Sequence, residues 1–387
     1  MTFIIFLIIL GILIFVHELG HFLVAKGAGV KVEEFGFGYP PRALKLGSKW
    51  GTLFTLNWIP FGGFVKIFGE NYEENKEGLI DKKEQKHTVP ALGHKDNALG
   101  TVVFVPSSFT EVSKKWQAAI LAAGVTFNII FAWLILSLGF MIGLPTPIDN
   151  DYGVAVENPT LTVIEAISDS PAEEAGLKSG DKIKSLSFGE GQILSDLNLE
   201  NTSDFINKSQ GEILVKIDRG GEIIDFKITP NTKIEDDRKL IGISMDMIGT
   251  LSLPIHRAIY EGGKTTFDIA YATIYGIGDL VGKAIKGNPD ISQIAGPVGI
   301  ISLVGDATKL GFVYLLTFTA LISINLAIIN LLPFPALDGG RIIFVIIESI
   351  TKRPINPKIA GSLNTVGFAL LILLMLIITY RDILRLF

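Results

Sequence analysis

Four long stretches without charged side chains constrain what this 387-residue chain can fold into. A helix needs about 20 mostly apolar residues to cross the hydrocarbon core of a bilayer. Three of the stretches meet that length by themselves, and they cover residues 116–148, 310–337 and 359–380. The first stretch, residues 1–16, meets it only when the helix continues to about Ala25. The sequence therefore predicts four transmembrane helices.

Residues 1–16 have a second interpretation, which is a secretory signal peptide. Such a peptide carries a basic start and a small-residue cleavage site before a polar mature sequence. Neither feature is present, because ring and charged side chains follow the apolar run directly. The transmembrane interpretation is therefore favoured.

Residues 265–285 are a candidate for a fifth crossing. Asp268, Asp279 and Lys283 interrupt this segment, and its apolar residues recur mostly at helical spacing. That pattern is typical of an amphipathic helix lying at the membrane surface. We therefore expect a surface helix rather than a crossing.

Composition narrows the chemistry that the chain can perform. There is no cysteine, which excludes disulfides, zinc ribbons, iron–sulfur clusters and cysteine nucleophiles. A tightly held metal must therefore use His, Asp, Glu or Asn, and the chain has five histidines. The net charge of −5 and the lack of a long Lys/Arg run argue against a nucleic-acid partner.

The basic residues beside the predicted spans indicate their orientation, because loops rich in Lys and Arg stay in the cytoplasm. The loops between spans one and two and between spans three and four are basic, whereas the segment after span two begins with acidic residues. We therefore expect both termini and residues 149–309 outside. Arg381 and Arg385 run against this orientation. The basic loop residues are Lys26, Lys31, Lys114, Lys115, Arg341, Lys352, Arg353 and Lys358.

A polar block at residues 150–248 has the pattern of a small α+β domain. Ser170 and Pro171 predict the start of a short helix, and Gly176 predicts its end. Strands are predicted at 154–156, 161–167, 213–217 and 223–228, a second helix at 203–208, and a hairpin turn at 218–222. Strands with two short helices resemble a PDZ domain, which binds extended chain ends by strand addition. The alternative is a folded spacer without a ligand.

The motif with the clearest chemical meaning is H-E-x-x-H at residues 17–21. His17 and His21 are four residues apart and share one helix face, where two imidazoles can hold one zinc ion. Glu18 can take a proton from a water on that ion. A polar end of a membrane helix is the ordinary alternative. The functional interpretation is favoured because ionisable groups at membrane depth are expensive, and zinc would stabilise them.

Asp338 is the candidate for a third ligand. A catalytic zinc keeps three protein ligands and one open position. The other three histidines lie in polar stretches, whereas Asp338 ends the uncharged run of the third span. Pro333 and Pro335 break the helix there, and unwound backbone at this depth must be buried in protein or line a cavity. By itself, Asp338 could instead be an interfacial helix terminator.

These motifs together resemble the site-2 protease family of intramembrane zinc metalloproteases, and within it the RseP-type bacterial regulators, here with one PDZ domain. The family's second motif, N-x-x-P-x-P-x-L-D-G, corresponds to residues 330–339. The resemblance implies Zn²⁺ as cofactor, with His17, His21 and Asp338 as its ligands and Glu18 as the general base. It further implies that the substrate-positioning elements include Asn330, Pro333 and Pro335.

The segment after the first span alternates strand-favouring residues with Gly and Pro at 35–38 and 50–70. Members of the family place a re-entrant β-hairpin here that dips toward the active site. The resemblance therefore implies that Gly62 and Gly63 contact the substrate, because an edge strand can pair with an extended chain. The alternative is a cytoplasmic hairpin whose edge is only structural.

The expected architecture is a multi-pass α-helical membrane protein with four transmembrane helices, a re-entrant β-hairpin and an inserted α+β PDZ domain. Its parts are a first transmembrane helix at 1–25, a cytoplasmic segment with the hairpin at 26–115, a second helix at 116–145, the PDZ domain at 150–248, an extracytoplasmic amphipathic segment at 249–309, a third helix with the L-D-G motif at 310–340 and a fourth at 359–380.

The resemblance implies hydrolysis of peptide bonds in or near the transmembrane helices of membrane-anchored regulatory proteins. Single-span substrates such as anti-sigma factors, or signal-peptide remnants, are the implied partners, together with the lipid bilayer and a peptide or protein ligand of the PDZ domain. The implied location is the bacterial inner membrane, with the active site toward the cytoplasm and the PDZ domain outside.

Two functions from other classes compete with proteolysis. One is a non-catalytic membrane scaffold, and intact Glu18 and Asp338 argue against it. The other is a zinc transporter, which would need a polar path across several helices. The second and fourth predicted spans contain no Asp, Glu or His, which disfavours such a path.

Overall fold

The computed structural model describes ten segments of the chain. They are residues 1–70, 94–96, 102–104, 108–148, 152–167, 170–189, 191–209, 211–232, 239–287 and 295–384. The chain separates into two compact units. Unit 1 comprises Met1–Trp133, Thr265–Leu303 and Thr319–Phe387, and unit 2 comprises Leu134–Lys264 and Val304–Phe318.

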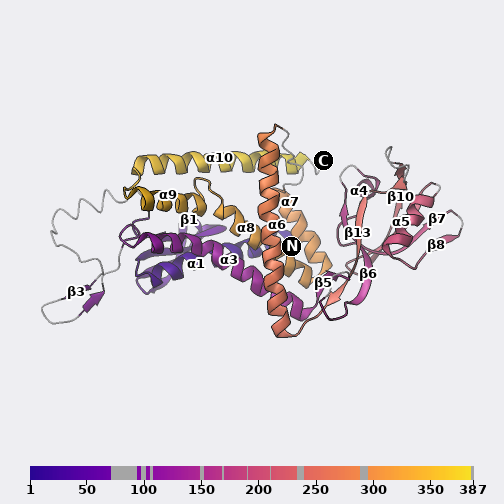
Figure 1. Cartoon of the computed structure of the whole chain (residues 1–387), viewed down its shortest axis with the longest axis horizontal. Coiled ribbons are helices and arrows are strands. Elements are labelled where there is room, and N and C mark those ends of the chain that lie inside the picture. The colour runs from indigo at the N-terminus through magenta and orange to yellow at the C-terminus, as the bar shows by residue number, and fades with distance from the viewer. Residues whose placement is uncertain are drawn as a thin grey trace. The chain divides into compact units, whose positions relative to one another are not determined.

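Long helices dominate the chain (Figure 1). They are α1 (Thr2–Gly27), α3 (Lys114–Ile142), α6 (Ile255–Ile285), α7 (Pro297–Leu310), α8 (Phe312–Leu331), α9 (Asp338–Thr351) and α10 (Pro357–Leu384). Four helices within the described segments, α1, α3, α8 and α10, are long and apolar enough to cross a membrane. The four predicted spans are therefore confirmed as candidate membrane helices. The segment 265–285 belongs to α6, which is not among the four.

The third predicted span, at 310–340, is interrupted where the sequence predicts a break at Pro333 and Pro335. Helix α8 stops at Leu331, and a separate helix, α9, starts at Asp338. The link between them is non-helical, as Pro333 and Pro335 require, and the two helices are drawn separately in Figure 1. Asp338 therefore begins a new helix instead of closing the old one.

Three glycines allow the chain to pack closely around this break. A Cβ on Gly340 would lie 2.8 Å from the carbonyl carbon of Phe334, and one on Gly339 would contact the carbonyl oxygens of Leu331 and Leu332. From α10, a Cβ on Gly367 would lie 2.6 Å from Cβ of Pro335. Real side chains do not tolerate such separations. The paired glycines after Asp338 are therefore part of what shapes the break.

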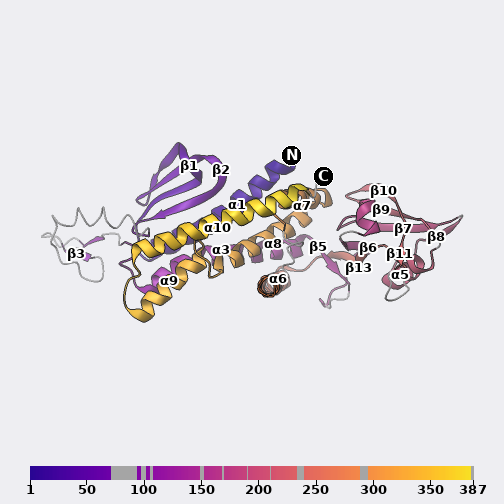
Figure 2. The same cartoon turned by 90° about the horizontal axis from the view of Figure 1, so that it is seen from above.

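The segment after α1 forms the predicted hairpin, with strands β1 (Val32–Lys49) and β2 (Thr52–Ile67). Residues 42–49 pair with residues 52–57, and residues 32–37 lie beside both 53–56 and 63–67. Phe35 and Ile67 of the hairpin pack in one buried cluster with Phe22 of α1. The hairpin thus lies against the helix that carries the H-E-x-x-H motif (Figure 2).

Unit 2 contains a sheet with strand order β10-β9-β7-β6-β13-β5, and β8 pairs with β7. The strands are β5 (Leu144–Pro147), β6 (Glu157–Ala166), β7 (Lys182–Phe188), β8 (Gln192–Leu194), β9 (Ile213–Arg219), β10 (Glu222–Ile228) and β13 (Ile243–Leu251). The described segments also contain β3 (His94–Asp96), β4 (Val102–Phe104), β11 (Asn231–Thr232) and β12 (Lys239–Leu240). Two short helices, α4 (Pro171–Ala175) and α5 (Leu199–Lys208), accompany the sheet.

The local signals in unit 2 act as the sequence predicts. Ser170 Oγ accepts a hydrogen bond from the Glu173 backbone N–H at 3.3 Å and so caps α4. Gly176 ends α4 with a left-handed φ of 93°. The turn between β9 and β10 contains Gly220 and Gly221, both with positive φ, which suits a two-residue hairpin loop.

The strand predicted at 154–156 is absent, because β6 begins at Glu157. That prediction was wrong: residues 154–156 are apolar and include two valines, which favour strands, but they have no ladder partner among the described residues. The helix predicted at 203–208 is longer than expected, because the side chain of Asn198 caps it through the Asn201 N–H at 2.8 Å.

A buried ion pair joins β9 to the loop after α4. Both oxygens of Asp181 accept hydrogen bonds from Arg219, each at 2.6 Å. Arg219 also donates to the Gly176 carbonyl oxygen at 2.8 Å. The Asp181 side chain is 1% exposed, so these donors, together with the Lys178 N–H at 2.8 Å, take the place of water around it.

Replacing Arg219 with Met should destabilise unit 2 by about 3–5 kcal/mol, because the Asp181 carboxylate would stay buried without its partner. Hydrogen exchange of β7 and β9 amides in the detergent-solubilised full chain measures this loss. The matched control is Lys208→Met, which removes an exposed pair with Asp204 and should cost less than about 1 kcal/mol. Equal losses in the two variants would contradict the assignment.

Candidate metal centre

Helix α1 positions two imidazoles on one side of itself. His17 and His21 are one helical turn apart, and they are only 8% and 7% exposed. Their Nε2 atoms lie 3.2 Å from each other. The uninterrupted apolar sequence before them keeps α1 helical through the motif. The i, i+4 spacing therefore brings the two imidazole rings together on one side of the helix.

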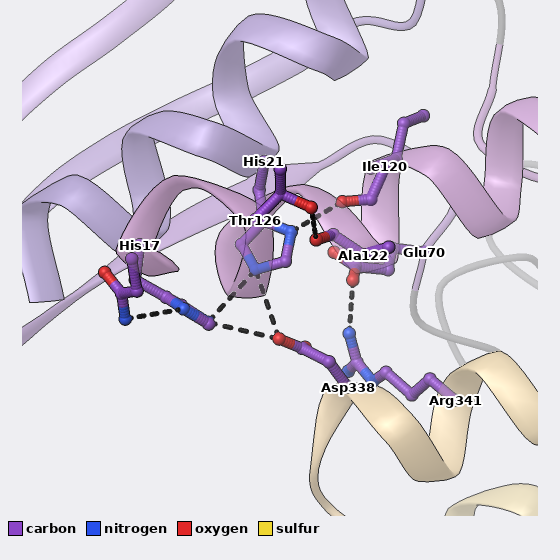
Figure 3. Close-up of polar contacts among 9 residues, drawn as sticks. His17, His21, Glu70, Ile120, Ala122, Thr126, Asp338 and Arg341 are labelled. Atoms are coloured by element: carbon purple, nitrogen blue, oxygen red, sulfur yellow. Dashed lines mark hydrogen bonds and ion pairs between the residues drawn. The ribbon is translucent and has the colours of Figure 1, made fainter. Parts of the chain in front are cut away.

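Helix α9 brings the carboxylate to the same point. Asp338 is its first residue, and Asp338 Oδ2 lies 3.1 Å from His17 Nε2 and 3.3 Å from His21 Nε2. Figure 3 shows the three side chains pointing toward one another from two helices. They are a group within the described segments whose ligand atoms could share a metal ion.

The spacing of the three atoms fits a tetrahedral zinc ion. Ligands at usual Zn–N and Zn–O distances of about 2.0–2.2 Å stand about 3.3 Å from one another in a tetrahedron. The three separations here are 3.1, 3.2 and 3.3 Å. Two histidines and one carboxylate also match the donor types of catalytic zinc sites, which keep a fourth position open.

Helix α3 supports the histidines through groups that carry no charge. The backbone carbonyl of Ile120 accepts a hydrogen bond from His21 Nδ1 at 2.7 Å, which leaves Nε2 free to bind a metal. One turn later, a Cβ on Gly124 would lie 2.6 Å from His17 Cε1 and 2.7 Å from its Nε2. Neither residue was predicted from the sequence, because a backbone carbonyl and a glycine leave no chemical signature in an apolar helix.

Strand β2 of the hairpin lies beside Glu18, the residue that follows His17. A Cβ built on Gly63 would lie 3.6 Å from Glu18 Cγ and 3.7 Å from a methyl carbon of Ile14. The structure therefore places Gly63 beside Glu18, as strand β2 passes α1. Gly62 has a positive φ of 94° and faces the ring of Tyr39 instead.

An ion pair next to the three candidate ligands was not anticipated from the sequence. Arg341 lies on α9, one turn after Asp338, and pairs with the carboxylate of Glu70 just beyond β2 (Figure 3). The pair joins the end of the hairpin to the helix that carries the candidate ligand. The residues are 271 positions apart, so no local pattern could have indicated the contact.

The other predicted site residues lie around the helix break. Asn330 is next to the last residue of α8, and Pro333 and Pro335 lie in the non-helical link. The link is held by α10, where Asn364 Oδ1 accepts a hydrogen bond from the Ala336 N–H at 3.3 Å. These residues are near Asp338 in the chain, and none of the three is a member of the candidate ligand group.

Residues 5–374 match the model of the family described as "Peptidase family M50". The chain belongs to this family of site-2 proteases. It is 31% identical over 439 residues to "Regulator of sigma-W protease RasP" from Bacillus subtilis (strain 168), covering 100% of this chain and 99% of the relative. It is 32% identical over 396 residues to a "Putative zinc metalloprotease" from Helicobacter pylori (strain J99), covering 99% of each.

Among solved structures, a PDZ domain of an SdrC-like protein from Listeria monocytogenes aligns with 24% of this chain and 93% of its own length. Its sequence identity is 19% and the TM-score is 0.20.

The family match confirms the predicted enzyme class, a zinc metalloprotease of the site-2 type, and the predicted Zn²⁺ cofactor. It also favours proteolysis over a scaffold or a zinc transporter, since the match covers most of the chain, including both motifs. The chain is accordingly a multi-pass membrane protein.

Replacing Gly124 with Ala should sharply lower the zinc content of the purified protein, because the new methyl group would occupy the space of both imidazoles. Metal analysis of the detergent-solubilised chain measures this, with about one zinc per chain expected for the unsubstituted protein. Gly11→Ala is the control, since Gly11 lies on α1 with open space around it. Full zinc content in the Gly124 variant would contradict the proposed packing.

Proposed function

We propose that this chain hydrolyses peptide bonds in or near the transmembrane helices of single-span membrane proteins, with zinc held by His17, His21 and Asp338. The observation that carries the proposal is the convergence of these three ligand atoms at tetrahedral spacing within unit 1. Two of the ligands lie on a helix apolar enough to cross the membrane. A buried group of this kind at that depth is expensive unless it binds a cation.

In this proposal Glu18 is the general base. When bound, zinc acts as a Lewis acid toward the scissile carbonyl and makes a water molecule at the site more acidic. Glu18 takes a proton from the attacking water and returns it to the leaving amine. Its location next to His17, with Gly63 opposite, leaves it between the ligand group and the hairpin.

The hairpin presents the substrate in extended form. A transmembrane helix bonds its own carbonyls internally, so a scissile bond becomes accessible only after local unwinding. Strand addition along the β2 segment around Gly63 would replace the lost hydrogen bonds. The path of the unwound chain is proposed to be lined by Gly62, Asn330, Pro333 and Pro335. In this arrangement the hairpin is re-entrant, because it enters the membrane to reach the substrate.

The substrates proposed here are membrane-anchored regulatory proteins such as anti-sigma factors, with signal-peptide remnants as the second class. The name of the Bacillus subtilis relative, a regulator of sigma-W protease, supports the first class. The sheet and two helices of unit 2 support a PDZ domain at 150–248 that binds an extended chain end.

The basic loops support a location in the bacterial inner membrane, with the active site toward the cytoplasm and the PDZ domain outside. We propose that the chain is divided as the sequence predicts, with the hairpin region 26–115 on the cytoplasmic side and the segments 150–248 and 249–309 on the other. The exposed Phe267, Tyr271 and Tyr275 of α6 suit the interface of a bilayer.

Replacing Glu18 with Gln should leave one zinc per chain and lower the cleavage rate of a model single-span substrate by about 10²- to 10⁴-fold, because the proton acceptor is removed. Cleavage and metal content are measured on the same preparation. Glu174→Gln, at an exposed site on α4, is the control and should cleave at the unsubstituted rate. Wild-type cleavage by the zinc-loaded Glu18 variant would refute the role of Glu18.

Replacing Asp338 with Ala should lower the zinc content itself, because the third ligand is lost. The cleavage rate should fall together with the zinc content. A cleavage assay and metal analysis, both carried out at increasing zinc concentration, measure these two quantities. Asp204→Ala on α5 changes an exposed carboxylate and should keep the metal. An Asp338 variant with full zinc affinity would show that the ion is held elsewhere.

A further inference from the structure

Asn128 is a buried polar residue to which neither sequence motif assigns a role. It lies on α3 with 0% of its surface exposed. Its side-chain Nδ2 is 3.4 Å from His17 Nδ1, and its Oδ1 has no hydrogen-bond partner among the described residues. A buried acceptor without a partner is costly, so its persistence next to a candidate metal ligand requires an explanation.

The chemistry of the ligand supplies one. A neutral imidazole that gives its Nε2 lone pair to a metal carries its hydrogen on Nδ1, and that hydrogen needs an acceptor. For His21 the acceptor is the Ile120 carbonyl at 2.7 Å. For His17 the neighbouring group is the Asn128 amide.

The amide can supply the acceptor without moving its helix. A half-turn about the Cβ–Cγ bond exchanges Oδ1 and Nδ2, which are nearly equal in size. Oδ1 then stands where Nδ2 is, 3.4 Å from His17 Nδ1, and accepts its hydrogen. The rotation pairs Oδ1 with the Nδ1 hydrogen of the tautomer that a metal requires, and Nδ2 takes the former place of Oδ1.

We propose that Asn128 is a positioning residue of the metal site, which accepts a hydrogen bond from His17 Nδ1 and so holds His17 Nε2 toward the ion. The inference rests on the proposed function of His17 as a ligand. Asn128 touches neither the ion nor the substrate in this arrangement.

The spacing along α3 makes the assignment coherent. Ile120, Gly124 and Asn128 are each four residues apart, so they form one stripe on the helix. The first orients His21, the second leaves room for both rings, and the third orients His17. Ser323 of α8 donates to the Asn128 carbonyl oxygen at 2.8 Å, which fixes this part of α3 against α8.

Cobalt binding by the metal-free full chain in detergent tests the proposal, because the visible absorption of Co²⁺ reports both affinity and ligand geometry. Asn128→Leu and the smaller Asn128→Ala remove the acceptor, whereas Asn128→Asp keeps one. The control is Asn325→Leu, which removes another amide, a part-buried one, on the neighbouring α8, where Asn325 Oδ1 accepts a hydrogen bond from Thr273 Oγ1 at 3.0 Å.

The expected result is a loss of cobalt affinity of about 10- to 100-fold in the Leu and Ala variants, with an altered spectrum, and near-normal affinity in the Asp variant and the control. Normal affinity and spectrum in either acceptor-free variant would overturn the proposal. An Asp variant as weak as the Leu variant would do so too, because it would indicate packing alone. Failure of the unsubstituted chain to bind cobalt would instead refute the proposed metal site.

Discussion

Polar groups at membrane depth must satisfy one another, and this requirement organises unit 1. His17 and His21 lie on an apolar helix that offers them no partner of its own. Their partners come from Asp338 at the start of α9 and from the Ile120 carbonyl on α3. The three helices therefore meet where their polar groups can be paired, and this convergence is what makes a zinc site possible.

The break between α8 and α9 is the second consequence of the same requirement. Two prolines stop the helix and release backbone groups that lipid cannot satisfy. The Phe334 N–H donates to the Leu332 carbonyl at 2.7 Å, and Asn364 of α10 accepts from the Ala336 N–H. Close glycine contacts keep the link compact. The irregular backbone is thus paired locally, while Asp338 is placed at a helix start facing the imidazoles.

The sequence predicted the parts of the structure that depend on local pattern. Long apolar runs gave the four candidate spans, the i, i+4 spacing gave the pairing of His17 with His21, and Asp338 followed from the need for a third ligand at the same depth. The contributions of α3 were not predictable, because Gly124 and the Ile120 carbonyl act through space and backbone. The start of α9 at Asp338 was not predicted for another reason. Prolines indicate where a helix stops, but no signal in the adjacent sequence indicated that a new helix begins after the link.

Helix geometry also gives His17 and Glu18, which are adjacent in the sequence, different surroundings in the proposed site. Consecutive residues on a helix point about 100° apart, so Glu18 is turned away from His17, but it is an i, i+3 neighbour of His21. The two imidazoles face α3 and α9, where His21 donates to the Ile120 carbonyl and His17 contacts Asp338. The proposed base instead lies beside Gly63 of the hairpin. Adjacent positions in the motif can therefore have different roles in this proposal: the two imidazoles are fixed by packing to hold the ion, and Glu18, beside His21, borders the strand along which an unwound substrate would add.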